Sequence, residues 1–218
     1  MKKIALILAG GKGVRMNNIL PKQFLIFNQL PLLMHTMRKF SSFDKIILVL
    51  PENHLELWNS LCEKYKFNIT HEIVVGGKTR FHSVRKGLEK ITENCFVAIH
   101  DGVRPLVSDD LINRLINKCK IGFGVIPVLS IKDSLRKFDK NHSKIVNREG
   151  IKRVQTPQCF YSEDIIHAYK QKYTNLFTDD SSVFQSDGGE LICIDGEEKN
   201  LKITNKDDLI FAINFIKK

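Results

Sequence analysis

The segment "KKIALILAGGKGVRMNNILPKQF", from Lys2 to Phe24, sets the expectation for the whole fold. Its apolar run Ile4–Ala9 ends abruptly in a loop with three glycines, which is followed by Arg15 and Lys22. Glycine lets a backbone approach a ligand closely and point its N–H groups at an anion. In an open α/β sheet, ligands bind at the carboxyl ends of the strands. The segment therefore predicts a buried strand that leads into a phosphate-binding loop; the alternative is a glycine-rich turn with solvated cations.

Two common nucleotide motifs do not fit the sequence. The dinucleotide pattern G-x-G-x-x-G finds Gly11 and Gly13, but Met16 stands at its third glycine position. The P-loop pattern ending in "GGKT" requires a glycine at position 72, which is Glu72. Both motifs depend on backbone contacts that only glycine permits at those positions. A dinucleotide-binding enzyme and a P-loop NTPase are therefore disfavoured.

Short apolar runs alternate with amphipathic segments over roughly the first 130 residues, the pattern of a parallel sheet covered by helices on both faces. We expect strands at Ile4–Ala9, Lys45–Leu50, Ile69–Val75, Cys95–Ile99 and Gly122–Val128, and helices at Leu32–Phe40, His54–Tyr65, Arg80–Ile91 and Asp109–Cys119. The prediction is an α/β fold in three layers, with a mostly parallel, twisted sheet.

The alternation is interrupted after Pro127. Ser130–Phe138 and Lys144–Val146 read as two short strands around the polar turn "DKNHS". A hairpin that projects from an α/β body leaves its edges exposed unless a second subunit covers them. We interpret Ile131–Arg153 as the dimerisation arm of a homodimer; an ordinary surface hairpin is the alternative.

Beyond the arm, the α/β pattern resumes to the end of the sequence. We expect helices at Ser162–Lys172, Thr178–Gln185 and Lys206–Ile216, and strands at Leu191–Ile194 and Leu201–Ile203. No repeat or long linker divides the 218 residues, so we expect one domain over residues 1–218.

Composition limits the class of protein. A hydrophobic content of 43% is normal for a globular core. No apolar run approaches the ~18–20 residues of a membrane span, so we expect no membrane partner. The five cysteines are scattered and form no C-x-x-C pair. This pattern argues against a disulfide framework or a zinc site and favours the reduced cytoplasm.

The formal net charge of +10 allows three interpretations. The cations form a solvated lysine-rich surface, attract small polyanionic substrates, or bind nucleic acid. They are dispersed rather than gathered in one stripe, and aromatic residues do not alternate with them. Nucleic-acid binding is therefore the least favoured of the three interpretations.

The motif "HDGVRP" places Asp101 at the carboxyl end of an apolar strand. A carboxylate there is suited to Mg²⁺, a hard cation that prefers carboxylate and phosphate oxygens. The alternative is that Asp101 caps the turn. Arg104 either pairs with Asp101 or holds an anion. His100 is expected to pack inside the fold, because neighbouring strand residues face opposite ways.

The motif "GGKTRFHSV" places a helix start near Thr79, directly after two glycines. Helix N-termini expose N–H groups that favour anions. Arg80 and Ser83 share one face of that helix; a plain strand–turn–helix is the alternative. Two further cations, Arg148 and Lys202, lie outside any amphipathic helix and, taken singly, read as solvated surface charges.

Together the motifs resemble a known family. "LAGGKGVRM…PKQF", "GGKTRFHSV", "HDGVRP", "QTPQCF" and "NLKIT" occur in this order, and the chain resembles the methylerythritol-phosphate cytidylyltransferases essentially end to end. The resemblance implies a Rossmann-like nucleotidyltransferase fold within the nucleotide-diphospho-sugar transferase-like superfamily. It implies transfer of a cytidylyl group from CTP to 2-C-methyl-D-erythritol 4-phosphate, with Mg²⁺, in non-mevalonate isoprenoid biosynthesis. The products are 4-diphosphocytidyl-2-C-methyl-D-erythritol and pyrophosphate.

The resemblance also implies residue roles, position by position. Arg15 and Lys22 match the pair that stabilises charge on the triphosphate, and Arg148 and Lys202 match the residues that position the sugar phosphate, with Arg148 coming from the neighbouring subunit. The implied nucleotide-binding residues are Ala9, Gly10, Gly11, Gly13, Gly77, Arg80 and Ser83; the implied substrate-binding residues are Arg104, Ser134, Arg148, Thr178 and Lys202; the implied metal ligand is Asp101.

Two alternatives remain open. Gly102 and Val103 stand where many family members carry two alanines, and Ser134 stands where threonine is common. A ribitol 5-phosphate cytidylyltransferase shares the valine, whereas "VNREGIKRVQTPQ" favours the methylerythritol enzyme. The remote alternative, a non-catalytic nucleotide- or RNA-binding protein, would have lost charged site residues that this chain retains.

Overall fold

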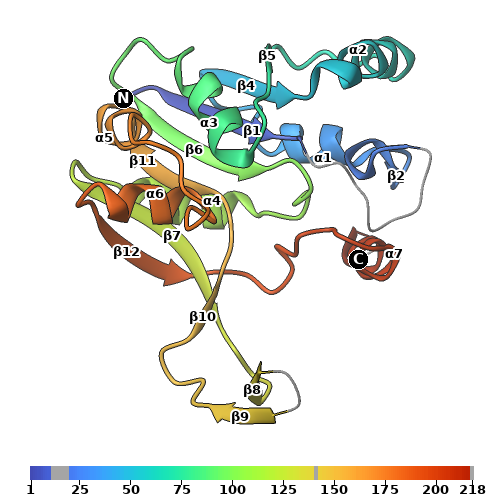
Figure 1. Cartoon of the computed structure of the whole chain (residues 1–218). Helices are drawn as coiled ribbons and strands as arrows, with labels where there is room; N and C mark the ends of the chain where they lie inside the picture. The colour runs from blue at the N-terminus through green and yellow to red at the C-terminus, as the bar shows by residue number, and fades with distance from the viewer. Residues whose placement is uncertain (11–19, 140–141, 217–218) are drawn as a thin grey trace.

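The computed structural model describes residues 1–10, 20–139 and 142–216, so the expected loop residues Gly11, Gly13 and Arg15 lie outside it. Its centre is an eight-stranded sheet (Figure 1). The strands of this sheet are β1 Lys3–Leu8, β4 Lys45–Leu50, β5 Glu72–Val75, β6 Phe96–Asp101, β7 Phe123–Ser130, β10 Lys152–Val154, β11 Gln158–Tyr161 and β12 Glu190–Asp195. Two further pairs lie outside it: β2 Ile26–Phe27 with β3 Leu30–Pro31, and β8 Leu135–Asp139 with β9 His142–Val146. The helices are α1 Leu32–Arg38, α2 Leu55–Lys64, α3 Arg80–Leu88, α4 Asp109–Lys118, α5 Ser162–Ala168, α6 Asp180–Ser186 and α7 Lys206–Ile216, with short 3₁₀ turns at Lys22–Phe24 and Glu52–His54.

Within the eight-stranded sheet four of the seven neighbouring pairs run parallel, so the sheet is mixed but mostly parallel, as the sequence predicts. β4 and β6 flank β1 in parallel, β5 continues the sheet beyond β4, and β12 runs parallel to β7. The exception is β11, which lies antiparallel between β6 and β7, while β10 pairs antiparallel with the far end of β7. The carboxyl ends of β1, β4 and β6 therefore meet at one edge of the sheet.

Helices cover both faces of the sheet and complete the three layers that the sequence predicts (Figure 1). Alternate residues of β1 face opposite sides: Ala5 and Ile7 join one core cluster, and Ile4 and Leu6 join the other. Helices α1, α2 and α4 pack on the first side, and α3, α5 and α6 pack on the second. Because both faces are buried, these strands read as continuous apolar runs.

Polar caps fix where the helices near the strand ends begin. The side chains of Thr79 and Ser108 accept hydrogen bonds from the backbone N–H groups of His82 and Leu111, at the starts of α3 and α4. Asp179 and Ser182 form a reciprocal capping box at the start of α6. Such caps satisfy N–H groups that have no partner within the helix.

Two expected strands differ from the structure. Residues 201–203 form no strand; the backbone N–H of Ile203 instead donates to the carbonyl of Val103, which holds this segment as a loop beside β6. The expected strand Ser130–Phe138 is divided, because β7 ends at Ser130 and β8 begins at Leu135. Strands β10 and β11 were not expected, since short segments on either side of Pro157 show little alternation.

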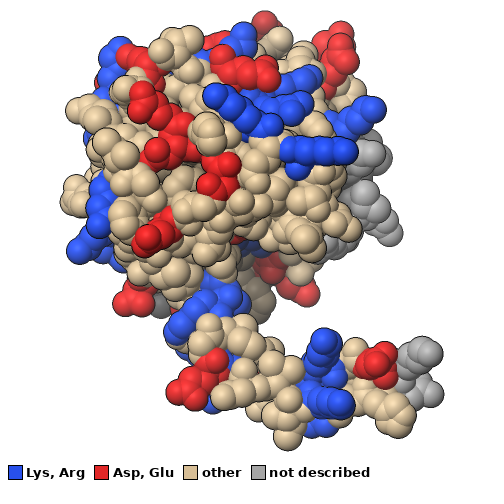
Figure 2. All heavy atoms as spheres, turned by 60° about the vertical axis from the view of Figure 1, so that its left-hand side comes forward, with Lys and Arg blue, Asp and Glu red and all other residues tan. Residues whose placement is uncertain are grey.

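Strands β8 and β9 form a separate antiparallel hairpin that projects from the body (Figures 1 and 2). Two large apolar residues on it are exposed, Phe138 to 73% and Ile145 to 80%. Strand pairing places both on the same face of the hairpin, because Phe138 pairs with Ser143 and Arg136 pairs with Ile145. This face, which also carries Arg136 and Ser143, thus exposes two large apolar side chains.

His100 is fully buried at the end of β6, as expected for a packing residue. Its Nε2 lies 3.1 Å from the carbonyl oxygen of Arg104, so Nε2 carries the proton and donates. Its Nδ1 then accepts from the hydroxyl of Thr156 at 3.1 Å. Burial lowers the pKa of His100 to about 4, which keeps the ring neutral.

This buried histidine predicts acid sensitivity of the fold. Below pH ~6.5 the unfolded chain binds a proton that folded His100 excludes, so the free energy of unfolding falls by about 1.4 kcal/mol per pH unit, down to pH ~4. We expect His100→Asn to remove this part of the slope. Urea unfolding between pH 4.5 and 7 measures it, with exposed His142→Asn as the control that retains it. Equal slopes for wild type and His100→Asn would show that His100 is not held neutral.

Candidate active site

A pocket of about 360 Å³ opens where the carboxyl ends of β1, β4 and β6 meet. The sequence led us to expect a ligand at this edge. The pocket is lined by Leu8, Ala9, Gly10, Lys22, Gln23, Val49, Gly77, Lys78, Thr79, Arg80, Ser83, Asp101, Val103 and Lys202. Segments far apart in the sequence therefore bring four basic side chains and one carboxylate to a single cavity.

Eight of the expected site residues line this pocket: Ala9, Gly10, Lys22, Gly77, Arg80, Ser83, Asp101 and Lys202. Others lie elsewhere in the subunit. Ser134 and Arg148 belong to the projecting arm, where Arg148 donates a hydrogen bond to the carbonyl of Lys132. Thr178 directly precedes the cap of α6, and its backbone N–H donates to the hydroxyl of Ser182.

The loop before α3 is shaped by Gly77 and Ser83. The Ser83 hydroxyl accepts from the backbone N–H of Gly77 at 3.0 Å and donates to the carbonyl of Thr79 at 3.0 Å. A side chain on Gly77 would place its Cβ 2.4 Å from the Cβ of His82, so the tight approach of loop and helix requires glycine. The turn thus brings the start of α3 to the pocket.

Asp101 is the carboxylate of the pocket wall. It is only 8% exposed, and one of its oxygens lies 3.1 Å from the ammonium of Lys202 and 3.3 Å from Nε of Arg104. Burial alone would raise the pKa of Asp101, but Lys202, Arg80 and Arg104 outweigh burial and hold that pKa well below its usual range. The carboxylate is therefore ionised and surrounded by cations.

Arg104 lies beneath this wall and does not line the pocket. It is 8% exposed, and besides Asp101 it donates to the carbonyl of Asn200 at 2.8 Å. The sequence left open whether Arg104 pairs with Asp101 or holds an anion; in this structure it pairs with Asp101. Through Asn200 it also braces the loop that carries Lys202.

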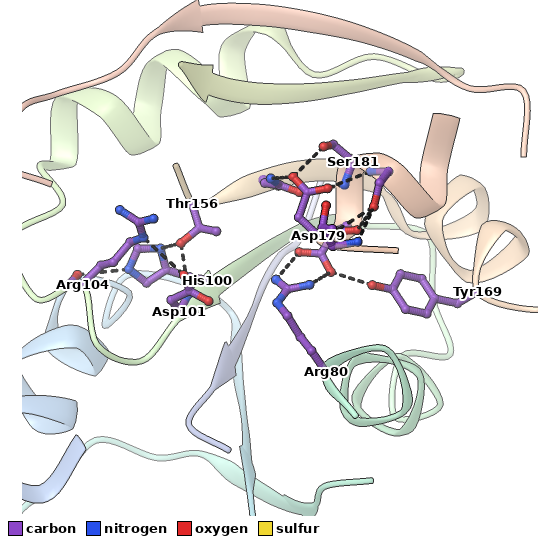
Figure 3. Close-up of polar contacts among 12 residues, drawn as sticks. Arg80, His100, Asp101, Arg104, Thr156, Tyr169, Asp179 and Ser181 are labelled. Carbon is purple, nitrogen blue, oxygen red and sulfur yellow. Dashed lines mark hydrogen bonds and ion pairs between the residues drawn. The ribbon is translucent and has the colours of Figure 1, made fainter. Parts of the chain in front are cut away.

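The motif "QTPQ", residues 155–158, ties three site segments together, a role that sequence reasoning missed. Gln155 donates to the carbonyls of Glu197 and Asn200 in the Lys202 loop. The Thr156 hydroxyl accepts from the backbone N–H of Asp101 at 3.0 Å (Figure 3). Gln158 accepts from the backbone N–H of Ser181 at the start of α6. The signal available in the sequence was a polar run directly before the apolar residues of β11.

Arg80 reaches from α3 across the pocket wall to α6 (Figure 3). Its guanidinium forms two parallel hydrogen bonds, of 2.7 and 2.6 Å, with the carboxylate of Asp180. Such fork-to-fork pairing fixes position as well as charge. The start of α3 and the start of α6 are thereby joined beside the cavity.

None of the helices in the described ranges combines the length and apolar character that crossing a bilayer requires. The same ranges contain no cluster of three or more His, Cys, Asp or Glu side chains placed to hold a metal by themselves. Among the residues that the structure describes, Asp101 is the one carboxylate that lines the pocket, beside four basic side chains.

Comparisons with known proteins agree with this geometry. The family model for 2-C-methyl-D-erythritol 4-phosphate cytidylyltransferase (IspD) matches residues 3–218. The protein of that name from Bacteroides fragilis is 44% identical over 215 residues, covering 97% of this chain and 98% of that protein.

Two solved structures that are similar to this chain carry the name of the same enzyme. The 4-diphosphocytidyl-2C-methyl-D-erythritol synthase of Anaerococcus prevotii is 30% identical with a TM-score of 0.79, covering 100% of this chain and 96% of that one. The 2-C-methyl-D-erythritol 4-phosphate cytidylyltransferase of Thermus thermophilus is 26% identical with a TM-score of 0.81, covering 100% of both chains. The chain therefore belongs to the 2-C-methyl-D-erythritol 4-phosphate cytidylyltransferase family.

Proposed function

We propose that this protein transfers a cytidylyl group from CTP to 2-C-methyl-D-erythritol 4-phosphate and releases pyrophosphate, as its family does. The observation that carries the proposal is the pocket at the strand ends, which Lys22, Arg80 and Lys202 line together with Asp101. Two polyanions must meet in this reaction, and a cation-lined cavity offsets their mutual repulsion. The product, 4-diphosphocytidyl-2-C-methyl-D-erythritol, belongs to non-mevalonate isoprenoid biosynthesis.

The chemistry requires no catalytic base. A phosphate oxygen of the acceptor attacks the α-phosphorus of CTP, forming a new P–O bond as the bond to pyrophosphate breaks in line. A phosphate monoester has its second pKa near ~6, so the acceptor is already ionised at neutral pH. Catalysis then rests on positioning and on neutralising charge in the transition state.

Each basic residue has a proposed role. Lys22 and Arg15 neutralise the triphosphate; Lys22 lines the pocket, whereas Arg15 is assigned on its motif alone. Lys202 binds the acceptor phosphate, since its ammonium lies at the pocket wall beside Asp101. Around the cytidine we propose Ala9, Gly10, Gly77, Arg80 and Ser83 from the pocket lining, with Gly11 and Gly13 assigned on the motif.

Asp101 is the proposed protein ligand for Mg²⁺. Mg²⁺ at phosphate-transfer sites is held by one or two carboxylates together with substrate phosphates and water, which a lone, ionised carboxylate at the pocket satisfies. Bound there, Mg²⁺ would neutralise phosphate charge. In the structure, Lys202 and Arg104 contact the same oxygen of that carboxylate.

The arm is proposed to complete the site of a second subunit. Its exposed Phe138 and Ile145 offer two large apolar side chains to a partner. Within one subunit, Arg148 and Ser134 do not line the pocket, which is what a site shared across a homodimer requires. We assign both residues, together with Thr178, to acceptor binding. Arg104 supports that side of the pocket through Asp101 and Asn200 rather than lining it.

We place the enzyme in the cytoplasm, because all five cysteines are free in the structure. The partners we propose are CTP, the polyol phosphate and a second copy of the chain.

The activity is tested by pyrophosphate release from CTP and Mg²⁺, with methylerythritol 4-phosphate and ribitol 5-phosphate assayed in parallel. We expect a clear preference for methylerythritol 4-phosphate, and EDTA is expected to abolish release. A preference for ribitol 5-phosphate would keep the cytidylyl chemistry and overturn the acceptor. Binding of generic RNA that outcompetes CTP at ~150 mM salt would instead support the non-catalytic alternative.

Lys202→Met should lower kcat by about 100-fold or more, the typical loss when one preorganised charged donor is removed. The matched control is Lys199→Met, an exposed lysine of the same loop, which should leave kcat within about twofold. Steady-state kinetics and a thermal unfolding curve measure both. Equal losses for the two variants would show that the loop matters only for folding.

Mixed dimers test the shared site. Arg148→Ala and Lys202→Ala subunits, each inactive alone, should regain activity when co-expressed with two different tags and purified as heterodimers. One of the two sites in each heterodimer then receives an intact Arg148 and an intact Lys202, so activity should approach about half of wild type. Heterodimers that stay inactive would place Arg148 in its own subunit's site.

A further inference from the structure

The pairing of Arg80 with Asp180 joins two elements 100 residues apart in the sequence. Asp180 is fully buried, whereas the side chain of Arg80 is 29% exposed and lines the pocket. A guanidinium has five N–H donors, and Asp180 takes one from each terminal nitrogen. In the described part of the chain no other side chain hydrogen-bonds Arg80, so donors remain for a ligand in the pocket.

Tyr169 adds a third hydrogen bond to the carboxylate of Asp180, from the core side. Its hydroxyl donates to the Asp180 oxygen that also accepts from Arg80, at 2.6 Å, and its ring stacks on Phe81, the residue after Arg80. The Tyr169 ring is 1% exposed and packs in the core. Tyr169 therefore fixes the rotation of the carboxylate, and the carboxylate fixes the plane of the guanidinium (Figure 3).

Asp180 is held in place without Arg80. The preceding residue, Asp179, caps α6 and accepts a hydrogen bond from Gln158 at 2.8 Å. Gln158 also accepts from the backbone N–H of Ser181. The residues on either side of Asp180 are thus anchored to β11, so the aspartate is the fixed partner and the longer arginine side chain is the one being positioned.

We propose that Asp180 and Tyr169 are positioning residues for CTP binding, which hold the guanidinium of Arg80 rigidly in the pocket wall. Neither touches the nucleotide; both act through Arg80. An arginine has many rotamers, and fixing one before the ligand arrives removes an ordering cost from binding. This inference rests on the proposed function, since it assigns Arg80 to the CTP site.

The charge of Asp180 allows a decisive test. Asp180→Asn removes a negative charge beside an anion site, so if the position of Arg80 did not matter, CTP would bind more tightly. If Asp180 acts by positioning, CTP binds more weakly despite the extra positive charge. Tyr169→Phe changes no charge and removes only the hydroxyl contact, which makes it a second variant that keeps the buried ring.

The Kd for CTP is measured by titration calorimetry, and KM and kcat by pyrophosphate release, with thermal unfolding on the same samples. We expect Asp180→Asn to raise the Kd for CTP about tenfold or more and Tyr169→Phe to raise it about threefold. The control is Asp110→Asn, which removes a carboxylate from Arg114 on α4 and should leave the Kd unchanged. In an Arg80→Met background, Tyr169→Phe should have no further effect on the Kd.

The outcomes are distinct. If Asp180 and Tyr169 only stabilise the fold, their variants will have a smaller folded fraction, so kcat will fall while the Kd and KM for CTP stay unchanged. That result overturns the inference. If the wild-type protein binds CTP and Asp180→Asn binds it equally or more tightly, the inference is overturned and the proposed function stands. Wild-type protein that neither binds nor consumes CTP overturns both.

Discussion

A carboxylate that is removed from water is costly unless cations surround it, and Asp101 is such a group at the end of β6. Lys202 and Arg104 contact it directly, and Arg80 adds attraction from further away. These cations come from a loop, a turn and a helix start. The cost of burying this charge is offset only while all three elements stay in place, so the stability of the buried carboxylate depends on the assembly of the whole pocket edge.

The supports around Asp101 are themselves polar and buried. The Thr156 hydroxyl accepts a hydrogen bond from the backbone N–H of Asp101, and the Gln155 amide donates to a carbonyl of the Lys202 loop. The side-chain oxygen of Gln158 accepts from a backbone N–H at the start of α6. The short segment 155–158, which leads from β10 into β11, thus positions three parts of the pocket. A buried network of this kind stabilises the fold only when its members are paired, which couples the geometry of the site to the stability of the sheet.

Much of this arrangement follows from the sequence. Continuous apolar runs such as Lys45–Leu50 predict strands buried on both faces, and Thr79 predicts a helix start, because these are local properties. The contacts of Arg80 with Asp180 and of Thr156 with Asp101 are not local. They depend on the antiparallel return of β11, which a four-residue strand after a proline does not reveal. Arg104 illustrates the limit: its motif allowed two partners, and only the packed structure places it against Asp101. The loop 201–203 was mistaken for a strand because its apolar residues face a neighbouring turn rather than a sheet.

The central claim is that the pocket acts by electrostatic positioning, without a residue that takes a proton from the acceptor. The most direct test is the single-turnover rate of cytidylyl transfer as a function of pH. Between about pH 7 and pH 9 the acceptor phosphate is fully ionised and lysine and arginine keep their charges, so the account predicts a rate constant within about twofold over this range. A rate that rises about tenfold per pH unit would reveal an enzyme base that titrates there, and would contradict the account.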